Sequence, residues 1–252
     1  MVFELNLEKA KTSLVLCLEK AGILKPPVMD MAFLLDVSGS FDDEHRSGIT
    51  NDMMSRLVPW GMVFDPDKKF EVYTFSNGPS HVHQVGDVNA SNYKNYIQRE
   101  IIDNVDGYNG GTDYSYALEA SIQNFGWGVT PKPEEKQGFL SKLFGKKQTV
   151  NVAPVVPKTG LVVMLTDGDN SDKYETIQVL QNAKNNGYKV FFLFIGVSNQ
   201  ANSFSFLKKL EKDFENVGFY AINDLKKFVN SSDDEINQAL ISQKLIDFLG
   251  NQ

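Results

Sequence analysis

Residues 31–40 read MAFLLDVSGS, an unbroken apolar run that ends in an aspartate and a turn of small polar residues. Residues 160–168 read GLVVMLTDG and have the same design. Short continuous apolar runs closed by turn residues are typical of strands that are covered on both faces. The two stretches therefore predict two central, buried strands, with Asp36 and Asp167 just beyond their apolar runs.

The rest of the chain alternates between strand-like and helix-like segments. Further strands are expected at residues 70–75, 81–85, 190–195 and 218–222. Helices are expected at residues 7–22, 44–60, 93–102, 114–125, 173–185 and 204–214, and from residue 235 onwards. This alternation predicts an α/β fold with a doubly wound, mostly parallel sheet and helices on both of its faces.

A stretch at about residues 128–158 interrupts this pattern and holds four of the nine prolines. We expect a flexible insertion there. Within it, residues 139–147 (FLSKLFGKK) form a short basic amphipathic segment that could make a weak contact with a membrane or a partner, or fold back on the domain. We divide the chain into an N-terminal helical extension packed on the domain (1–27) and one domain (28–252).

The composition excludes some classes of function. The 252 residues include 25 Lys and Arg against 32 Asp and Glu, for a net charge of −7, which argues against a nucleic-acid partner. The only cysteine, Cys17, cannot form an intramolecular disulfide, as is usual in a reducing compartment. We see no signal peptide and no apolar run long enough for a transmembrane segment, so we expect a cytoplasmic protein.

Oxygen-bearing side chains follow the two buried strands. The carboxyl ends of parallel strands share one edge of a sheet, where ligands bind in doubly wound folds. Carboxylates and hydroxyls are hard donors that suit Mg²⁺, Ca²⁺ or Mn²⁺ rather than zinc or copper. Two carboxylates just neutralise such an ion, and an incomplete protein shell leaves a coordination position open. The predicted metal ligands are Asp36, Ser38, Ser40, Thr112 and Asp167.

These five residues resemble the metal-ion-dependent adhesion site (MIDAS) of von Willebrand factor A (VWA) domains. That motif combines D-x-S-x-S after the first strand, a threonine on a middle loop, and the aspartate of a T-D-G turn. The resemblance implies a Rossmann-like sheet with a divalent cation at its top, most often Mg²⁺, with Ca²⁺ or Mn²⁺ as alternatives. It implies direct coordination by the hydroxyls, with the aspartates acting partly through water. A Glu or Asp of a protein partner would supply the sixth ligand.

A narrower likeness rests on residues 5–23 (LNLEKAKTSLVLCLEKAGI), 33–41 (FLLDVSGSF), 56–77 (RLVPWGMVFDPDKKFEVYTFSN) and 110–118 (GGTDYSYAL). These segments resemble the A-domain of TerF-type tellurite-resistance proteins. The likeness implies a place in a stress or tellurium-resistance system.

Three functions remain open at this point. We expect a non-enzymatic module for protein–protein interaction that captures an acidic residue through the metal. The first alternative is a metal-dependent hydrolase or phosphatase, but Ser38 stands where the D-x-D motif of haloacid-dehalogenase-type phosphatases has its second aspartate. No G-x-S-x-G, P-loop or dinucleotide motif follows a predicted strand. The second alternative is a scaffold with a purely structural ion.

Other polar residues near the motif have structural interpretations. We expect Asp42, Asp43, Asp113, Asp169 and Asp172 to stabilise helix starts. As an alternative, Asp113 and Asp169 could form hydrogen bonds that orient the metal ligands. His45 follows the first motif, and we expect it to be exposed on a helix.

Overall fold

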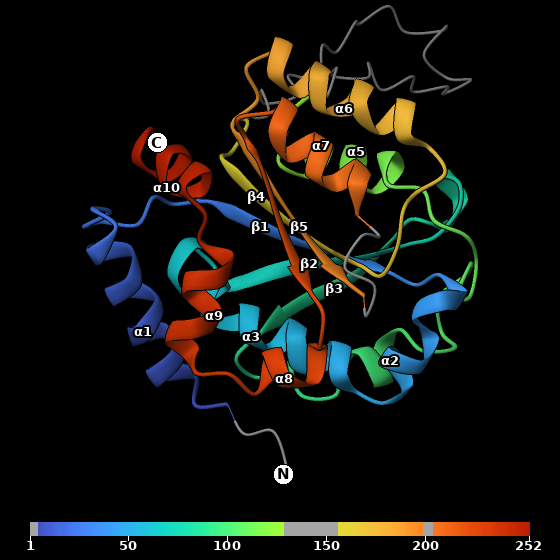
Figure 1. The fold of residues 1–252 in the computed structure, drawn as a ribbon, viewed down its shortest axis with the longest axis horizontal. Coiled ribbons are helices and arrows are strands. Elements are labelled where there is room, and N and C mark those ends of the chain that lie inside the picture. The colour runs from blue at the N-terminus through green and yellow to red at the C-terminus, as the bar shows by residue number, and fades with distance from the viewer. Residues whose placement is uncertain (1–4, 129–155, 199–203) are drawn as a thin grey trace, which may run out of the picture.

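The computed structural model describes residues 5–128, 156–198 and 204–252, and within these residues six strands form one sheet in the order β3-β2-β1-β4-β5-β6 (Figure 1). Four of the five strand pairs are parallel, and β3 runs antiparallel to β2 at one edge. The strands are β1 (Asp30–Asp36), β2 (Lys69–Phe75), β3 (His83–Asn89), β4 (Gly160–Thr166), β5 (Val190–Val197) and β6 (Val217–Ile222).

Helices cover both faces of this sheet (Figure 1). One face carries α5 (Ser115–Asn124), α6 (Lys173–Asn185) and α7 (Ser205–Asp213). The other face carries α1 (Leu7–Lys20), α3 (Ile49–Phe64), α4 (Tyr96–Glu100), α8 (Leu225–Val229), α9 (Asp233–Leu240) and α10 (Gln243–Gly250). The short helix α2 (Asp42–Arg46) and the 3₁₀ turns η1 (Gly39–Phe41) and η2 (Pro79–His81) follow the ends of strands.

The two stretches that predict central strands form the middle of the sheet. Every residue of β1 and β4 is buried, and the two strands pair in register from Asp30 opposite Gly160 to Leu35 opposite Leu165. Alternate residues enter the two hydrophobic cores, because successive side chains of a strand point to opposite faces. The doubly wound, mostly parallel sheet with helices on both faces is thus confirmed.

Some element boundaries differ from the prediction. The helix expected at residues 44–60 is two helices, α2 and α3, because Gly48 between them adopts a φ of 85° that ends the first. The strand expected at residues 81–85 begins only at His83, after the 3₁₀ turn η2. The terminal helix expected from residue 235 is α9, which begins at Asp233, followed by the separate helix α10.

The first helix, α1, is part of the core on its face of the sheet. Leu14 and Leu18 are fully buried, and α1 packs on α3 and α9. The Ser13 hydroxyl donates to Asp234 and accepts a hydrogen bond from the Asn237 amide. Most of the expected insertion, including the amphipathic segment 139–147, lies outside the described residues. None of the helices in the described part of the chain combines the length and the apolar character needed to cross a bilayer.

Candidate metal centre

The carboxyl ends of β1 and β4 lie side by side and place Asp36 and Asp167 at one edge of the sheet. The Asp36 side chain is fully buried. Its Oδ2 accepts a hydrogen bond from the Thr166 hydroxyl at 2.6 Å, and its Oδ1 accepts one from the Ser38 backbone N–H at 2.9 Å. Both oxygens of the Asp36 carboxylate therefore accept a hydrogen bond from the protein.

The two serines connect the turn after β1 to the turn after β4. Ser38 Oγ lies 3.3 Å from Ser40 Oγ, and the Ser40 hydroxyl donates to Asp167 Oδ1 at 3.0 Å. Residues 127 positions apart in the chain thus meet through a hydrogen bond. The structure brings together Asp36, Ser38, Ser40 and Asp167 in one polar cluster.

Backbone contacts join the loop that carries Thr112 to the turn after β1. Gly110 forms a β-bridge with Ser38, and the Gly110 carbonyl accepts a hydrogen bond from the Gly39 N–H at 3.0 Å. The Thr112 carbonyl accepts one from the Ser171 N–H at 2.9 Å, so Thr112 lies between the two turns. Its side chain is half-buried, and its hydroxyl forms no hydrogen bond with any described residue. The hydroxyl can therefore accept an outside partner without giving up a protein contact.

The close approach of this loop requires the absence of a side chain at Gly110. A Cβ atom at this position would lie 2.6 Å from Asn77 Oδ1 and 2.8 Å from Ser76 Oγ. At Gly111, the nearest atom to such a Cβ would be the Asn77 Cβ at 3.4 Å, which is ordinary van der Waals contact. Of the two glycines, only Gly110 is sterically required.

The carboxylates of Asp36 and Asp167 have no Lys or Arg partner in the part of the chain that the structure describes. Burial raises the pKa of Asp36 to about 6, although the hydrogen bonds from Thr166 and Ser38 act in the opposite direction. Burial also raises the pKa of Asp167. Within the described residues, neither carboxylate forms an ion pair with Lys or Arg. Buried charges are normally paired or bound to a metal, so this donor set fits a divalent cation.

The donor set also restricts the kind of cation. In the described ranges, no three His, Cys, Asp or Glu side chains gather as a metal-binding group. A cation at this edge would therefore rely on the hydroxyl oxygens as well as on the two carboxylates. Such oxygen ligands are typical of Mg²⁺, Ca²⁺ and Mn²⁺.

His45 is buried beneath the turn, and the expectation that it is exposed is wrong. Its Nε2–H donates to the Asp36 carbonyl at 2.8 Å, and its Nδ1 lies 2.9 Å from Thr50 Oγ1. Burial lowers the pKa of His45 to about 4, so the ring is neutral at pH 7. Helical periodicity could not reveal this position, because His45 is buried by its contacts with the Asp36 carbonyl and the Phe41 ring, which come from the strand end and turn before the helix.

Asp172 joins the turn after β4 to the start of α5. Its carboxylate accepts hydrogen bonds from the backbone N–H groups of Tyr114 and Ser115 at 2.9 and 2.7 Å. The prediction that this aspartate stabilises a helix start is confirmed, but the helix is α5 and not its own helix, α6, where its side chain makes no capping bond. This contact fixes the orientation of the Thr112 loop.

The other aspartates near the motif have varied partners. Asp113 accepts a hydrogen bond from the Gly78 N–H at 2.8 Å and does not cap α5, contrary to expectation. Asp169 forms an ion pair with Lys173 at 2.8 Å. Asp42 and Asp43 lie in the first turn of α2, as predicted.

Residues 28–244 match a family model described as vWA-TerF-like, the von Willebrand A domain found in the C terminus of TerF. The chain belongs to this TerF-like VWA family. Its relative YcbR, an uncharacterised protein of Bacillus subtilis (strain 168), is 22% identical over 243 residues, which make up 94% of this chain and 84% of YcbR.

Two solved structures share the VWA-type architecture. Proximal thread matrix protein 1 from the mussel byssus superposes with a TM-score of 0.52 and 17% identity over 89% of this chain. BatB from Bacteroides thetaiotaomicron gives 0.50 and 13% identity over 85% of this chain and all of BatB. This chain covers about half of the mussel protein, 48% of its length. At these identities the likeness concerns the fold alone.

Proposed function

We propose that this VWA domain is a divalent-cation-dependent module that binds an acidic residue of a protein partner. The observation that supports it is the polar cluster of Asp36, Ser38, Ser40 and Asp167, whose carboxylates have no cationic side chain among the described residues. Thr112 adds a hydroxyl that is free to coordinate. Family membership favours the same interpretation.

The chemistry of the proposed site follows from its oxygen donors. Asp36, Ser38, Ser40, Thr112 and Asp167 would hold Mg²⁺, or alternatively Ca²⁺ or Mn²⁺. The ion would supply the positive charge that the two carboxylates lack, and it would stay electrophilic toward a further carboxylate. We propose binding rather than catalysis because Ser38 occupies the place of a phosphatase acid/base. A cytoplasmic stress or tellurium-resistance system is the proposed setting.

Thr112→Ala is the most direct test of the cation site. Because the Thr112 hydroxyl forms no hydrogen bond with a described residue, its removal should leave the melting temperature of the metal-free protein almost unchanged. We expect Mg²⁺ affinity, measured by calorimetry, to fall at least about tenfold, and Thr112→Ser to restore it. A matched control is Thr12→Ala on the exposed surface of α1. Unchanged Mg²⁺ affinity in Thr112→Ala would contradict the proposed ligand set.

A binding experiment with a protein partner distinguishes the proposed metal-dependent binding from the two alternative functions, the structural ion and the phosphatase. A bound protein partner should stay on the immobilised domain in Mg²⁺, leave with EDTA, and fail to bind Thr112→Ala. A purely structural ion would instead give a lower melting temperature with EDTA while complexes persist. Mg²⁺-dependent hydrolysis of a generic phosphate ester, lost in Asp36→Ala, would indicate the phosphatase.

A further inference from the structure

The loops around the proposed cation site are strongly acidic. We define the acidic rim as residues 36–46, 103–113 and 167–173, which the contacts of Ser38, Gly110 and Ser171 hold at one edge of the sheet. These segments contain ten acidic residues and only two basic ones, Arg46 and Lys173. The acidic residues are Asp36, Asp42, Asp43, Glu44, Asp103, Asp106, Asp113, Asp167, Asp169 and Asp172.

Several of these acidic side chains form ion pairs within the rim or accept hydrogen bonds from backbone N–H groups beside it. Arg46 pairs with Asp42 at 2.8 Å and with Asp103 at 2.7 Å. Lys173 pairs with Asp169 at 2.8 Å. The carboxylates of Asp113 and Asp172 accept backbone N–H groups.

Besides Asp36, Asp167, Asp113 and Asp172, three more rim carboxylates have no cationic partner among the described residues. Asp43 and Asp106 are exposed and Glu44 is half-buried, and none of them has an ion-pair partner in the part of the chain that the structure describes. Glu44 lies close to Asp167, whose charge adds to burial in raising the pKa of Glu44. A divalent ion would balance only Asp36 and Asp167, so the rim keeps a net negative charge around the proposed open position.

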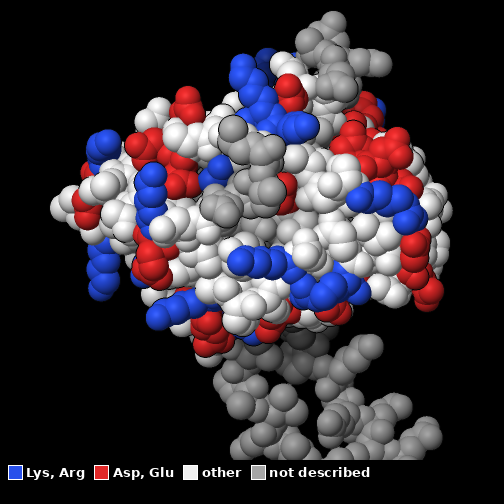
Figure 2. Space-filling view, turned by 90° about the horizontal axis from the view of Figure 1, so that it is seen from below, with Lys and Arg blue, Asp and Glu red and all other residues white. Residues whose placement is uncertain are grey.

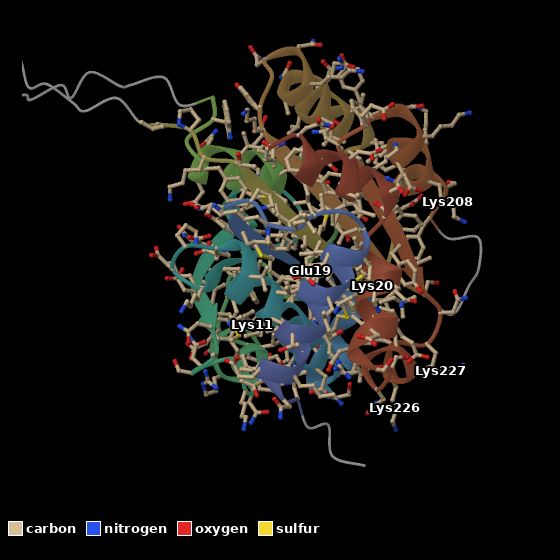
Figure 3. All side chains as sticks on the ribbon, turned by 90° about the vertical axis from the view of Figure 1, so that its left-hand side faces the viewer. Lys11, Glu19, Lys20, Lys208, Lys226 and Lys227 are labelled. Carbon is tan, nitrogen blue, oxygen red and sulfur yellow. The ribbon has the colours of Figure 1, made fainter. Side chains whose placement is uncertain are left out.

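The opposite side of the molecule carries both lysines and acidic residues. Figure 3 faces this side, where Lys11, Glu19 and Lys20 lie on α1, Lys208 on α7, and Lys226 and Lys227 on α8, while α9 contributes acidic residues in its first turn. In Figure 2, red and blue side chains are interspersed over the visible face, and red side chains lie toward both ends. The excess of acidic over basic residues is therefore a property of the three rim segments themselves.

We propose that the partner of this rim is a protein segment whose metal-binding carboxylate is flanked by Lys or Arg residues. This inference rests on the proposed function. A carboxylate in a neutral or acidic segment approaches against the field of Asp43, Glu44 and Asp106, whereas flanking cations are attracted by it. In this proposal the cation binds the partner's carboxylate, and the acidic rim attracts the Lys or Arg residues on either side of that carboxylate.

Four synthetic peptides test this inference against the isolated full chain by fluorescence anisotropy. Each has a central Glu or Gln, flanked on both sides by two Lys or by two Ser. In saturating Mg²⁺, we expect the Lys-flanked Glu peptide to bind at least about tenfold tighter than the Ser-flanked Glu peptide. The Lys-flanked Glu peptide should bind more tightly than the Lys-flanked Gln peptide in Mg²⁺ but not in EDTA. Its affinity should fall as the NaCl concentration rises from about 50 to 200 mM.

The outcomes separate the two proposals. Equal, Mg²⁺-dependent binding of both Glu peptides would overturn the flanking-charge inference and leave the proposed function standing. If neither Glu peptide gains affinity from Mg²⁺, both proposals are overturned. If the Lys-flanked Glu and Gln peptides bind equally well with and without Mg²⁺, the contact is merely electrostatic, and both proposals are overturned.

Two matched triple variants localise the effect. The rim variant Asp43→Asn, Glu44→Gln and Asp106→Asn removes three charges that are not proposed ligands. The control variant Glu19→Gln, Asp67→Asn and Glu215→Gln removes three exposed charges outside the rim. At saturating Mg²⁺, we expect the rim variant to lose at least about fivefold of the preference for the Lys-flanked Glu peptide, and the control to keep it. An equal loss in both variants would assign the preference to net charge and overturn the inference.

Discussion

At the scale of single residues, the end of β1 is held by contacts that the motif itself does not contain. Asp36 is bound at its carboxylate by the Thr166 hydroxyl and at its carbonyl by the His45 ring. His45 is neutral and uses both ring nitrogens within the fold. D-x-S-x-S predicts the oxygens of the proposed cation site, and these two contacts hold Asp36, the first residue of the motif, in place.

Glu71 gives a pH-dependent prediction at this scale. It is half-buried on β2, and its Oε2 has no hydrogen-bond partner among the described residues. Burial, followed by the charges of Asp65 and Asp87, raises the pKa of Glu71 to about 7. The folded state then holds a proton on Glu71 that the unfolded state releases near its ordinary pKa of 4.5. This contribution to stability is complete below about pH 4.5 and is lost as the pH rises through 7.

Glu71→Gln should remove this dependence, because the amide stays neutral. In urea unfolding from pH 4.5 to 8, we expect the free energy of unfolding of the variant, relative to wild type, to rise with pH. Glu119→Gln on the exposed surface of α5 is the control for replacing a solvent-exposed carboxylate by an amide. A pH-independent difference for Glu71→Gln would contradict the assigned pKa.

At the scale of elements, the Thr112 loop depends on the space beside Gly110. Gly110→Ala places a methyl group against Asn77 Oδ1, Ser76 Oγ and the Gly107 carbonyl oxygen, so the Thr112 loop or these neighbours must shift. We expect the free energy of unfolding to fall by about 1–3 kcal/mol, as for other overpacked sites, and Mg²⁺ affinity to fall with it. Gly111→Ala is the neighbouring control and should change both quantities little. Similar effects of the two substitutions, in thermal unfolding and calorimetry, would disprove the steric argument.

The arrangement of whole elements shows where prediction from sequence succeeds. The apolar runs of β1 and β4 and the polar turns after them are local features, and they predict the sheet and its functional edge. The separation of α2 from α3 depends on a single positive φ at Gly48. The cap of α5 comes from Asp172, 58 positions from Tyr114, so no local pattern contains it.

At the scale of the whole molecule, α1 belongs to the folded unit although it precedes the residues that the family model matches. A chain that begins at residue 28 lacks Leu14 and Leu18, whose burial is worth about 3–6 kcal/mol. Since domains are stable by only about 5–15 kcal/mol, we expect this truncation to melt much earlier or to aggregate. A chain that begins at residue 5 keeps α1 and is the control. Equal melting temperatures of the two chains in a thermal scan would show that α1 is dispensable.

The sequence alone determined the α/β class, the order of the strands and of most helices along the chain, and the candidate set Asp36, Ser38, Ser40, Thr112 and Asp167, but it missed α8 and the divisions between α2 and α3 and between α9 and α10. It could do so because hydrophobic periodicity and turn residues act over a few neighbouring positions. Only the tertiary structure decided that His45 is buried, that Asp172 caps α5, and that the acidic residues of three distant segments face one edge. Those features arise from contacts between residues far apart in the chain, and such contacts exist only once the sheet has brought the loops together.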